Sequence, residues 1–233
     1  LWARDPARAA AIAAARENAR YLPGVALPPE IAVTADAAAA LDGARLALLA
    51  VPAQHLRATL AALPDMDAPL LLCAKGVERG TTRFPMEIVE ELRPAARAAV
   101  LSGPNFAGEV ARGLPAAAVV ASHDAAARGL AADLLATPAF RLYAGDDPVG
   151  VEVGGAAKNV IAIAAGAVIG AGLGENARAA LITRGIAELS RLAVALGGRA
   201  ETAAGLSGIG DLLLTATGAG SRNTSLGLAL GRG

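Results

Sequence analysis

The sequence predicts an α/β protein in which a doubly wound parallel sheet is followed by an all-helical domain. Short, continuously apolar runs recur through the first 147 residues, and helical patterns separate them. Such runs are typical of strands buried on both faces of a sheet, and their alternation with helices is typical of βαβ units. Beyond residue 147 we find only long helical patterns rich in Ala, Gly and Ile.

The individual elements follow from these patterns. The expected strands are residues 45–51, 69–74, 98–101, 116–121 and 140–143. The expected helices are residues 6–18, 53–62, 84–92, 123–136, 149–172, 176–196 and 209–217. We therefore predict two domains, residues 1–147 and 148–233, with ligands at the carboxyl ends of the strands. Glycines inside the later helices predict close helix packing or a ligand, because each costs up to about 1 kcal/mol relative to Ala: Gly154, Gly155, Gly166, Gly170 and Gly185.

Composition excludes several classes of protein. The 233 residues include 21 basic and 21 acidic side chains, so the chain has no net charge to attract nucleic acid or an anionic membrane. A hydrophobic content of 55% is enough for a sizeable core. No apolar run of 18 residues is free of Gly or charge, so we expect no transmembrane segment. The single cysteine, Cys73, excludes a disulfide framework and fits the cytoplasm, and no spacing indicates a metal site.

Lysine is scarce, since only Lys75 and Lys158 occur among the 21 basic residues. Arg is always charged, whereas burial can lower the pKa of a Lys until it exchanges a proton near neutral pH. Lys158 lies within an apolar helical pattern, and we discount an ion pair with Glu152 because a six-residue spacing puts them on different helix faces. Lys75 follows a predicted strand, where it reaches the ligand crevice or, alternatively, lies in a surface turn.

Other polar residues are candidates on local grounds. The turn at 102–105 can bind an anion with its backbone N–H groups, although an ordinary strand-to-helix turn is equally expected. Ser221, Arg222 and Asn223 end a Gly-rich segment and offer donors suited to a phosphate. From its neighbours in the sequence, we interpret Asp211 as a helix N-cap. Near the start, Arg4 is placed to accept a ribose 2′-phosphate and Asp5 to cap a helix. We interpret both histidines, His55 and His123, as surface residues.

Together these motifs resemble the bacterial NAD(P)-dependent glycerol-3-phosphate dehydrogenases along essentially the whole sequence. The resemblance rests most specifically on the segments Gly-Gly-Ala-Ala-Lys-Asn at 154–159 and Asn-Ala-Arg-Ala-Ala-Leu-Ile-Thr-Arg-Gly at 176–185. Further matches are the segments at 1–4, 21–24, 50–52, 74–76, 102–104, 208–212 and 221–223. The resemblance implies a Rossmann domain followed by a helical domain like the C-terminal domain of 6-phosphogluconate dehydrogenase.

The resemblance also implies a reaction and roles for residues. The family reduces dihydroxyacetone phosphate to sn-glycerol 3-phosphate for phospholipid synthesis, with NAD or NADP as cofactor. Lys158 matches the catalytic proton donor and acceptor. The positions that match substrate contacts are Lys75, Gly103, Asn105, Lys158, Asp211, Ser221, Arg222 and Asn223. The positions that match cofactor contacts are Arg4, Tyr21, Lys75, Ala107 and Arg222. A small-molecule substrate and a homodimer are the partners we expect.

Two departures and two alternatives accompany the resemblance. The sequence contains no GxGxxG fingerprint, so we expect about thirty residues of the opening βα unit to precede Leu1, and the helical domain to continue past Gly233. Asn105 stands where the family commonly has Ser or Thr. The first alternative is a related dehydrogenase of 2-hydroxy or 3-hydroxy acids. The second is a nucleotide-binding regulator without activity.

Overall fold

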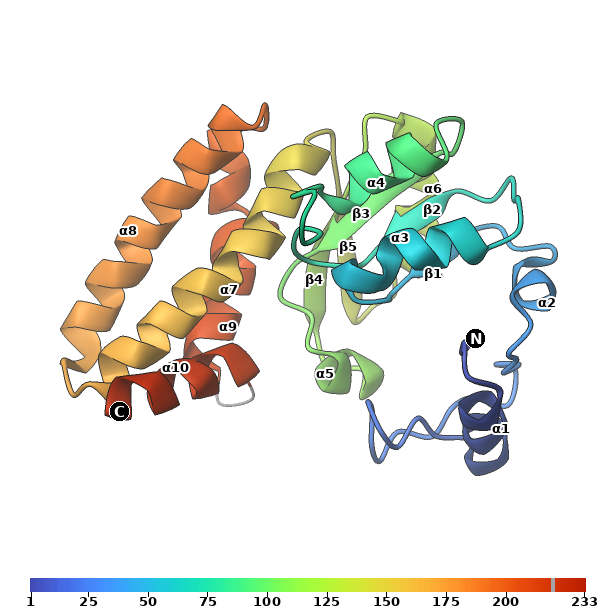
Figure 1. Ribbon diagram of the computed structural model, residues 1–233, viewed down its shortest axis with the longest axis horizontal. Helices are drawn as coiled ribbons and strands as arrows, with labels where there is room; N and C mark the ends of the chain where they lie inside the picture. The colour runs from blue at the N-terminus through green and yellow to red at the C-terminus, as the bar shows by residue number, and fades with distance from the viewer. Residues whose placement is uncertain (219–220) are drawn as a thin grey trace.

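Five strands form one sheet in the order β1-β2-β3-β4-β5 in the computed structural model, which describes residues 1–218 and 221–233 (Figure 1). The strands are β1 (Ala47–Leu49), β2 (Leu70–Leu72), β3 (Ala98–Ser102), β4 (Ala116–Ala121) and β5 (Phe140–Gly145). Each lies within or overlaps one of the five predicted apolar runs. The positions of all five predicted strands are therefore confirmed.

The sheet is mixed rather than purely parallel. β1, β2 and β3 run parallel, β4 is antiparallel to β3, and β5 is parallel to β4. The cause lies in the connection from β3 to β4, which holds only the five-residue helix α5 (Ala107–Ala111). A parallel connection must cross the sheet, usually through a longer helix. The chain instead turns at the end of β3 and returns beside it.

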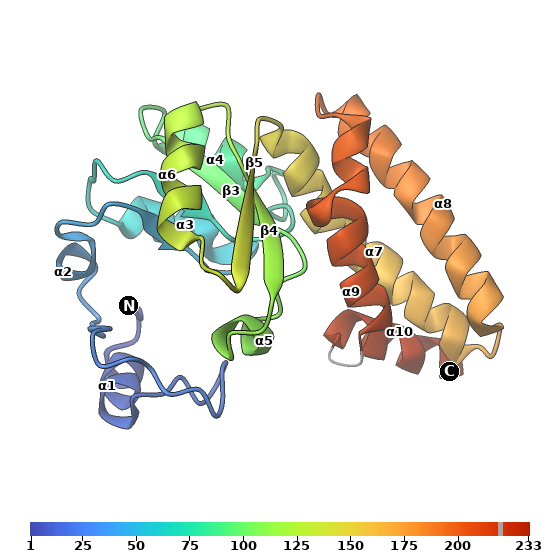
Figure 2. The ribbon, with the colours of Figure 1, turned by 180° about the vertical axis from the view of Figure 1, so that it is seen from behind.

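Helices cover both faces of the sheet, as predicted for a doubly wound fold. Figures 1 and 2 show α3 (Ala53–Ala62) and α4 (Pro85–Leu92) on one face and α6 (Ala125–Leu135) on the other. The side chains of Leu70 and Leu72 belong to the core under α3 and α4, whereas Leu71 belongs to the core under α6. All three are at most 1% exposed, which explains why the run is apolar at every position.

The N-terminal segment lies apart from this sheet. It contains α1 (Pro6–Ala15) and α2 (Ala37–Leu41), and one parallel bridge joins Trp2 to Thr34. Asp5 caps α1 by accepting a hydrogen bond from the Ala7 amide at 3.0 Å, which confirms its predicted capping role. In Figure 1 this segment, drawn in blue, lies at the end of the molecule opposite the C-terminal helices.

Helices follow the last strand, and no strand is described in residues 148–218 or 221–233. They are α7 (Pro148–Gly170), α8 (Gly174–Ala195), a 3₁₀ helix (Ala200–Ala204), a π-helical turn (Leu206–Gly210), α9 (Asp211–Thr217) and α10 (Arg222–Arg232). The start of this part at Pro148, just after β5 ends at Gly145, is compatible with the predicted domain boundary near residue 147. That boundary stays a prediction.

Close packing explains the glycines of α7. A Cβ atom on Gly166 would lie 3.0 Å from the Cα of Gly227 in α10, and one on Gly154 would lie 2.7 Å from the carbonyl oxygen of Ser207. α10 and the π-helical turn therefore approach α7 at distances that only glycine allows. Of the two roles predicted for these glycines, close packing is confirmed.

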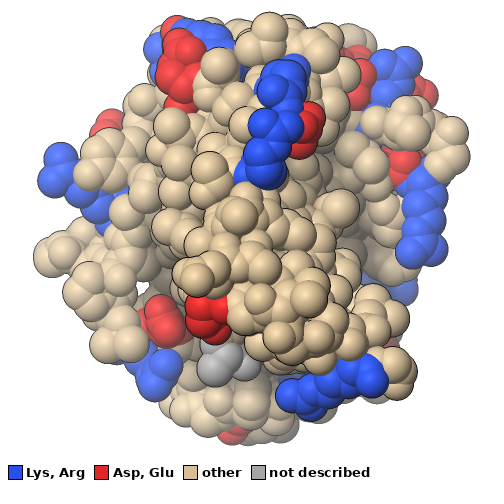
Figure 3. All heavy atoms as spheres, turned by 90° about the vertical axis from the view of Figure 1, so that its left-hand side faces the viewer, with Lys and Arg blue, Asp and Glu red and all other residues tan. Residues whose placement is uncertain are grey.

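α7 is also the one helix, within the described residues, that is long and apolar enough to cross a membrane. It contains the buried charged residues Glu152 and Lys158 and shares a core with α8 and α9, which is typical of a central packing helix. The outer side of the helical part carries few charged groups over much of its surface (Figure 3). Exposed aliphatic side chains of the helical part as a whole include Leu192, Val194, Leu196 and Leu230.

Candidate active site

Two lysines meet one carboxylate where the sheet adjoins the helical part. Lys75 follows β2, Lys158 lies in the middle of α7, and Asp211 is the first residue of α9. The Lys75 Nζ donates to Asp211 Oδ2 at 2.5 Å and to the Gly103 carbonyl oxygen at 3.3 Å, while the Lys158 Nζ contacts Asp211 Oδ1. Three segments that lie far apart in the sequence thus bring Lys75 and Lys158 into contact with the same carboxylate.

Burial changes the acidity of Lys158. The residue is 7% exposed, and the loss of water, together with the positive charge of Lys75, lowers its pKa from 10.5 to about 8. Asp211 opposes this shift, since its negative charge favours the ammonium form. The balance leaves an amine that exchanges a proton near neutral pH, as the sequence predicts for Lys158.

Asp211 does not have the local role that its sequence suggests. Gly210 is the N-cap of α9, and the Asp211 side chain, 2% exposed, turns to the two lysines instead of capping the helix. The preceding residues form a π-helical turn, a feature that often occurs at functional sites. Interpreting Asp211 as an N-cap is therefore wrong, because a distant pair of cations outweighs the local capping contact.

The turn after β3 borders the lysines. Gly103 has φ +151°, and a Cβ atom there would lie 2.8 Å from the Cα of Ala118, so only glycine fits. Pro104 and Phe106 lie against the two ends of α9, at Gly210 and Gly218. Asn105, half-buried, and Ala107, the first residue of α5, belong to the same turn.

The start of α10 lies on the other side of Lys158. Asn223 donates from Nδ2 to the Oδ1 of Asn159, the residue after Lys158, at 2.7 Å. Ser221 is the N-cap of α10 and accepts from the Thr224 amide at 3.2 Å, while Arg222 is exposed. Residues 221–223, which we predicted to end a Gly-rich turn, instead form the N-terminus of α10. Residues 219–220 of the predicted turn lie outside the described part of the chain. Asn159 belongs to the Lys158 motif, but its pairing with Asn223 was not predicted.

Glu152 is buried near the site without an ion pair to Lys158, in agreement with the sequence. Its Oε1 accepts from the Met86 amide at the start of α4 at 2.9 Å. Burial raises the pKa of Glu152 to about 8, and Glu87 and Glu90 act in the same direction. Beside it, the Ser102 hydroxyl is buried and has no hydrogen-bond partner among the described residues. From the sequence we considered Glu152 only as a partner of Lys158 and Ser102 only as part of the turn at 102–105, so their burial beside each other was not predicted.

The two adenosine-side candidates lie elsewhere. Arg4 and Tyr21 are exposed and belong to the N-terminal segment, where the Tyr21 ring stacks with the guanidinium groups of Arg8 and Arg20. The histidines His55 and His123 are exposed, as predicted. No group of three or more potential metal ligands occurs in residues 1–218 and 221–233.

Two hollows of the surface do not contain the lysines. One cavity, of about 570 Å³, is lined by residues of β4 and β5 and of the segment 199–207. Another, of about 700 Å³, is lined by residues of the segments 36–44 and 64–68. Neither Lys75, Lys158 nor Asp211 lines them. The candidate site is therefore identified by its chemistry, and Lys75 lines a much smaller cavity together with Ser102 and Glu152.

Comparison with known sequences assigns the chain to a family. The family described as NAD-dependent glycerol-3-phosphate dehydrogenase N-terminus matches residues 1–128, and the corresponding C-terminus family matches residues 147–233. The glycerol-3-phosphate dehydrogenase [NAD(P)+] of Acidiphilium cryptum is 59% identical over 233 residues, which cover all of this chain and 71% of the relative. The enzyme of the same name from Mesorhizobium japonicum is 56% identical and is covered to 68%.

Solved structures agree with the sequence comparison. The crystal structure of glycerol-3-phosphate dehydrogenase from Coxiella burnetii superposes with a TM-score of 0.94 at 39% identity, over all of this chain and 72% of that one. A structure from Dunaliella salina superposes with a TM-score of 0.87 at 26% identity, over 97% of this chain and 40% of that one. Matches at both ends of the chain, in sequence and in structure, lead to one conclusion: the chain belongs to the family of NAD-dependent glycerol-3-phosphate dehydrogenases.

Proposed function

We propose that the protein catalyses the reversible reduction of dihydroxyacetone phosphate to sn-glycerol 3-phosphate, with Lys158 as general acid and base. The observation that carries the proposal is the shared contact of Lys75 and Lys158 with Asp211, at the carboxyl ends of β2 and β3. Ligands of doubly wound sheets bind at this edge. An amine with a pKa of about 8 can both donate and accept a proton under physiological conditions.

The proton transfer follows from the geometry. In the reducing direction the Lys158 ammonium donates a proton to the C2 oxygen of the substrate, while bound NAD(P)H supplies the hydride to C2. In the reverse direction the neutral Lys158 amine accepts the proton of the C2 hydroxyl group. Lys75 stabilises the negative charge that develops on the oxygen, and Asp211 holds both amines in place.

The substrate phosphate requires donors at the other end of the site. The N-terminus of α10 supplies free backbone N–H groups, and Ser221, Arg222 and Asn223 lie in its first turn. The Asn159–Asn223 hydrogen bond links this turn to the residue after Lys158. We therefore assign the phosphate to α10 and the carbonyl to Lys158, which leaves Gly103 and Asn105 to contact the substrate from the β3–α5 turn.

The described residues fit the nicotinamide end of the cofactor. Lys75, Gly103 and Ala107 lie where the strands end, and the unpaired hydroxyl of Ser102 is buried behind them. Arg4 and Tyr21 are our candidates for the adenosine end. The choice between NAD and NADP depends on Arg4, which is placed to neutralise a 2′-phosphate, and its substitution by Ala should raise the KM for NADPH more than for NADH.

Three broader expectations belong to this proposal. We place the reaction in glycerophospholipid synthesis and the protein in the cytoplasm, with a homodimer as its assembly. The homodimer is supported by the exposed aliphatic side chains of the helical part and by the small number of charged groups over much of its outer side (Figure 3). Light scattering on the full-length protein measures its mass directly, and a monomer at all concentrations would contradict the dimer.

Substitution of Lys158 by Arg tests the proposal. Arg keeps the positive charge beside Asp211 but cannot release its proton, so we expect the rate of dihydroxyacetone phosphate reduction to fall about 100-fold or more. The variant should still bind NADPH and keep its thermal transition. Activity within threefold of the wild type would exclude Lys158 as the acid and base. Activity of the wild type on 3-hydroxyisobutyrate alone would instead favour the hydroxy-acid alternative.

A further inference from the structure

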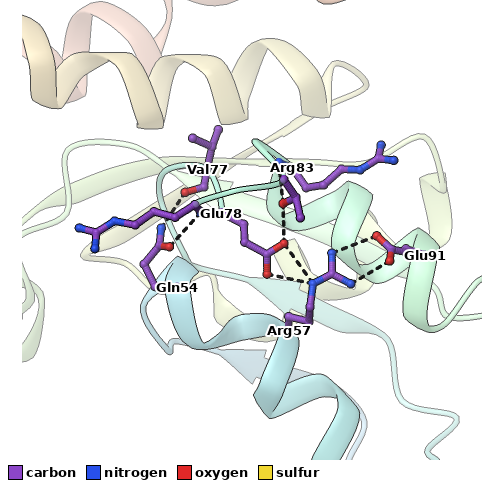
Figure 4. Close-up of polar contacts among 8 residues, drawn as sticks. Gln54, Arg57, Val77, Glu78, Arg83 and Glu91 are labelled. Atoms are coloured by element: carbon purple, nitrogen blue, oxygen red, sulfur yellow. Dashed lines mark hydrogen bonds and ion pairs between the residues drawn. The ribbon is translucent and has the colours of Figure 1, made fainter.

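The segment that joins β2 to α4 carries Lys75 but has no regular structure of its own. Residues 73–84 contain no helix or strand, and three of them, Gly76, Gly80 and Thr82, have positive φ. A segment of this kind is stabilised by its side-chain contacts rather than by repeated backbone hydrogen bonds. Two side chains of α3, Gln54 and Arg57, supply such contacts (Figure 4).

Gln54 binds the backbone of the segment on both sides of Glu78. Its Nε2 donates to the Val77 carbonyl oxygen at 2.7 Å, and its Oε1 accepts from the Arg79 amide at 3.0 Å. One side-chain amide thus fixes an acceptor two residues after Lys75 and a donor four residues after it.

Arg57 binds two carboxylates at once. Its Nε donates to both oxygens of Glu78 at 2.9 and 3.0 Å, and its two Nη atoms donate to the two oxygens of Glu91 in α4, each at 2.9 Å. Glu78 also accepts from the Thr81 hydroxyl at 2.6 Å. An exposed ion pair contributes little by itself, but a guanidinium with bidentate contacts inside a network is the exception. The Glu78 side chain is only 12% exposed, in keeping with such a network.

We propose that Gln54 and Arg57 are positioning residues of the reaction, which hold residues 77–79 and thereby keep the Lys75 amine at Asp211 and at the Gly103 carbonyl. The proposal rests on the proposed function, because it gives Lys75 a place in catalysis. Neither residue contacts the lysines. They act through the residues of the segment that follow Lys75, Val77 to Arg79.

Loss of this positioning has a consequence that loss of stability alone does not have. The charge of Lys75 is one of the causes that lower the pKa of Lys158. If residues 77–79 are released, Lys75 spends less time beside Asp211, and the pKa of Lys158 rises. The charged groups that face Lys158 from other elements are Asp211 and Lys75. A displacement of Lys75 therefore changes the pKa of Lys158, and the pH dependence of kcat reports that change.

Arg93 provides a matched control. It also ties α3 to α4, since its guanidinium donates to the carbonyl oxygens of Leu60, Leu63 and Pro64 at the far end of α3. Its side chain is 15% exposed, compared with 28% for Arg57. Arg57→Met and Arg93→Met therefore remove comparable links between the same two helices, but only Arg57 contacts the segment that carries Lys75.

The test compares the two variants in the full-length protein. We expect Arg57→Met to lower kcat/KM for dihydroxyacetone phosphate about tenfold. As the pH rises, kcat of this variant should begin to decrease about half a pH unit higher than kcat of the wild type. Arg93→Met should leave both within twofold of the wild type, even where it lowers the thermal transition as much. Arg57→Lys, which restores a single ion pair, should recover part of the rate. Equal pH profiles and rates in the two Met variants would overturn the proposal.

A second variant decides the case if Arg57→Met does not fold. Gln54→Ala removes two hydrogen bonds from an exposed residue, and we expect about a threefold loss of kcat/KM with the same direction of pH shift. The neighbouring exposed His55→Ala is its control. An unchanged pH profile in Gln54→Ala would contradict the positioning role. Failure of the proposed function is separate, since it would appear as an active Lys158→Arg variant.

Discussion

Glu152 and Lys158 lie on the same helix, are equally buried, and titrate near the same pH from opposite directions. Their exposed fractions are 8% and 7%, and burial raises the pKa of the acid to about 8 and lowers that of the amine to about 8. Their surroundings differ. Glu152 faces α4, with one backbone amide as its partner and the acids Glu87 and Glu90 nearby. Lys158 faces a carboxylate and a second amine.

The difference shows what a buried titratable group needs before it can take part in chemistry. Burial alone favours the neutral form, so Glu152 becomes an uncharged hydrogen-bonding group in the packing between α7 and α4. A counter-charge such as Asp211 makes the charged form accessible again. Lys158 can therefore exist in both forms over a narrow pH range, which proton transfer requires.

Removal of the counter-charge should have the largest effect. Asp211→Asn leaves two amines facing a neutral amide, and we expect reduction of dihydroxyacetone phosphate to fall about 100-fold. Because Asp211 raises the pKa of Lys158, its loss should also move the fall of kcat to lower pH. Steady-state kinetics between pH 6 and pH 9 measure both effects.

Asp147→Asn is the matched control for that change. Asp147 is also a buried acid, but its carboxylate accepts from the amides of Gly150 and Arg199 and from the Thr202 hydroxyl, away from the lysines. Its substitution should lower stability and leave the pH profile in place. If Asp147→Asn moved the profile as far as Asp211→Asn, the pairing of Asp211 with Lys158 would not control the proton.

An intermediate effect is expected at Glu152, and on stability rather than on the rate. The pKa of Glu152 is raised in the folded state, so its contribution to stability is present below about pH 4.5 and is lost as the pH rises to about 8. Glu152→Gln keeps the shape and has no proton to lose. The melting temperature of the variant minus that of the wild type should therefore increase by about 10 °C between pH 5 and pH 8.5.

The comparison with Lys158 sharpens this measurement. The lowered pKa of Lys158 acts on stability mainly between about pH 8 and 10.5, and in the opposite sense, so the two residues have separate pH ranges. The Gln variant should keep its kcat within threefold. A melting difference that does not change with pH would mean that Glu152 is ionised in the folded protein at neutral pH.

The smallest effects are expected at the two glycines between these residues. In Gly154→Ala the new Cβ would lie 2.7 Å from the backbone oxygen of Ser207, and we expect a loss of about 1–3 kcal/mol in the free energy of unfolding. In Gly155→Ala it would lie 3.1 Å from the Ser102 hydroxyl, which can rotate away. Chemical denaturation should show a smaller loss for Gly155→Ala, and the reverse order would contradict the packing.

Much of the fold could be predicted because it depends on local patterns. β1 to β4 consist almost entirely of apolar residues, so their positions stand out in the sequence, whereas β5 carries the exposed Arg141 and gives a weaker pattern. The direction of β4 could not be predicted, since it depends on how the chain leaves β3. The start of α10 was interpreted as a turn, because Ser221 and Arg222 follow a Gly-rich segment, although they begin a helix of 11 residues.

The candidate site was only partly predictable for a similar reason. The scarcity of lysine in the sequence singled out Lys75 and Lys158, which are the two amines at the site. Asp211 looked like a helix cap because its partners are 53 and 136 residues away. Gln54 and Arg57 gave no signal, since exposed polar residues on a helix are common and their contacts exist only when the segment after β2 folds against α3.

Direct titration of Lys158 tests the central claim, that this amine exchanges a proton near neutral pH. The 233 residues contain only two lysines, so labelling lysine with ¹³C at Cε gives a simple NMR spectrum, in which the signal lost in Lys158→Arg and the signal lost in Lys75→Arg assign the two residues. We predict that the Lys158 signal titrates with a pKa of about 8 in the full-length protein. A pKa of about 10.4 for Lys158, the value of an unperturbed lysine, would contradict its role as acid and base.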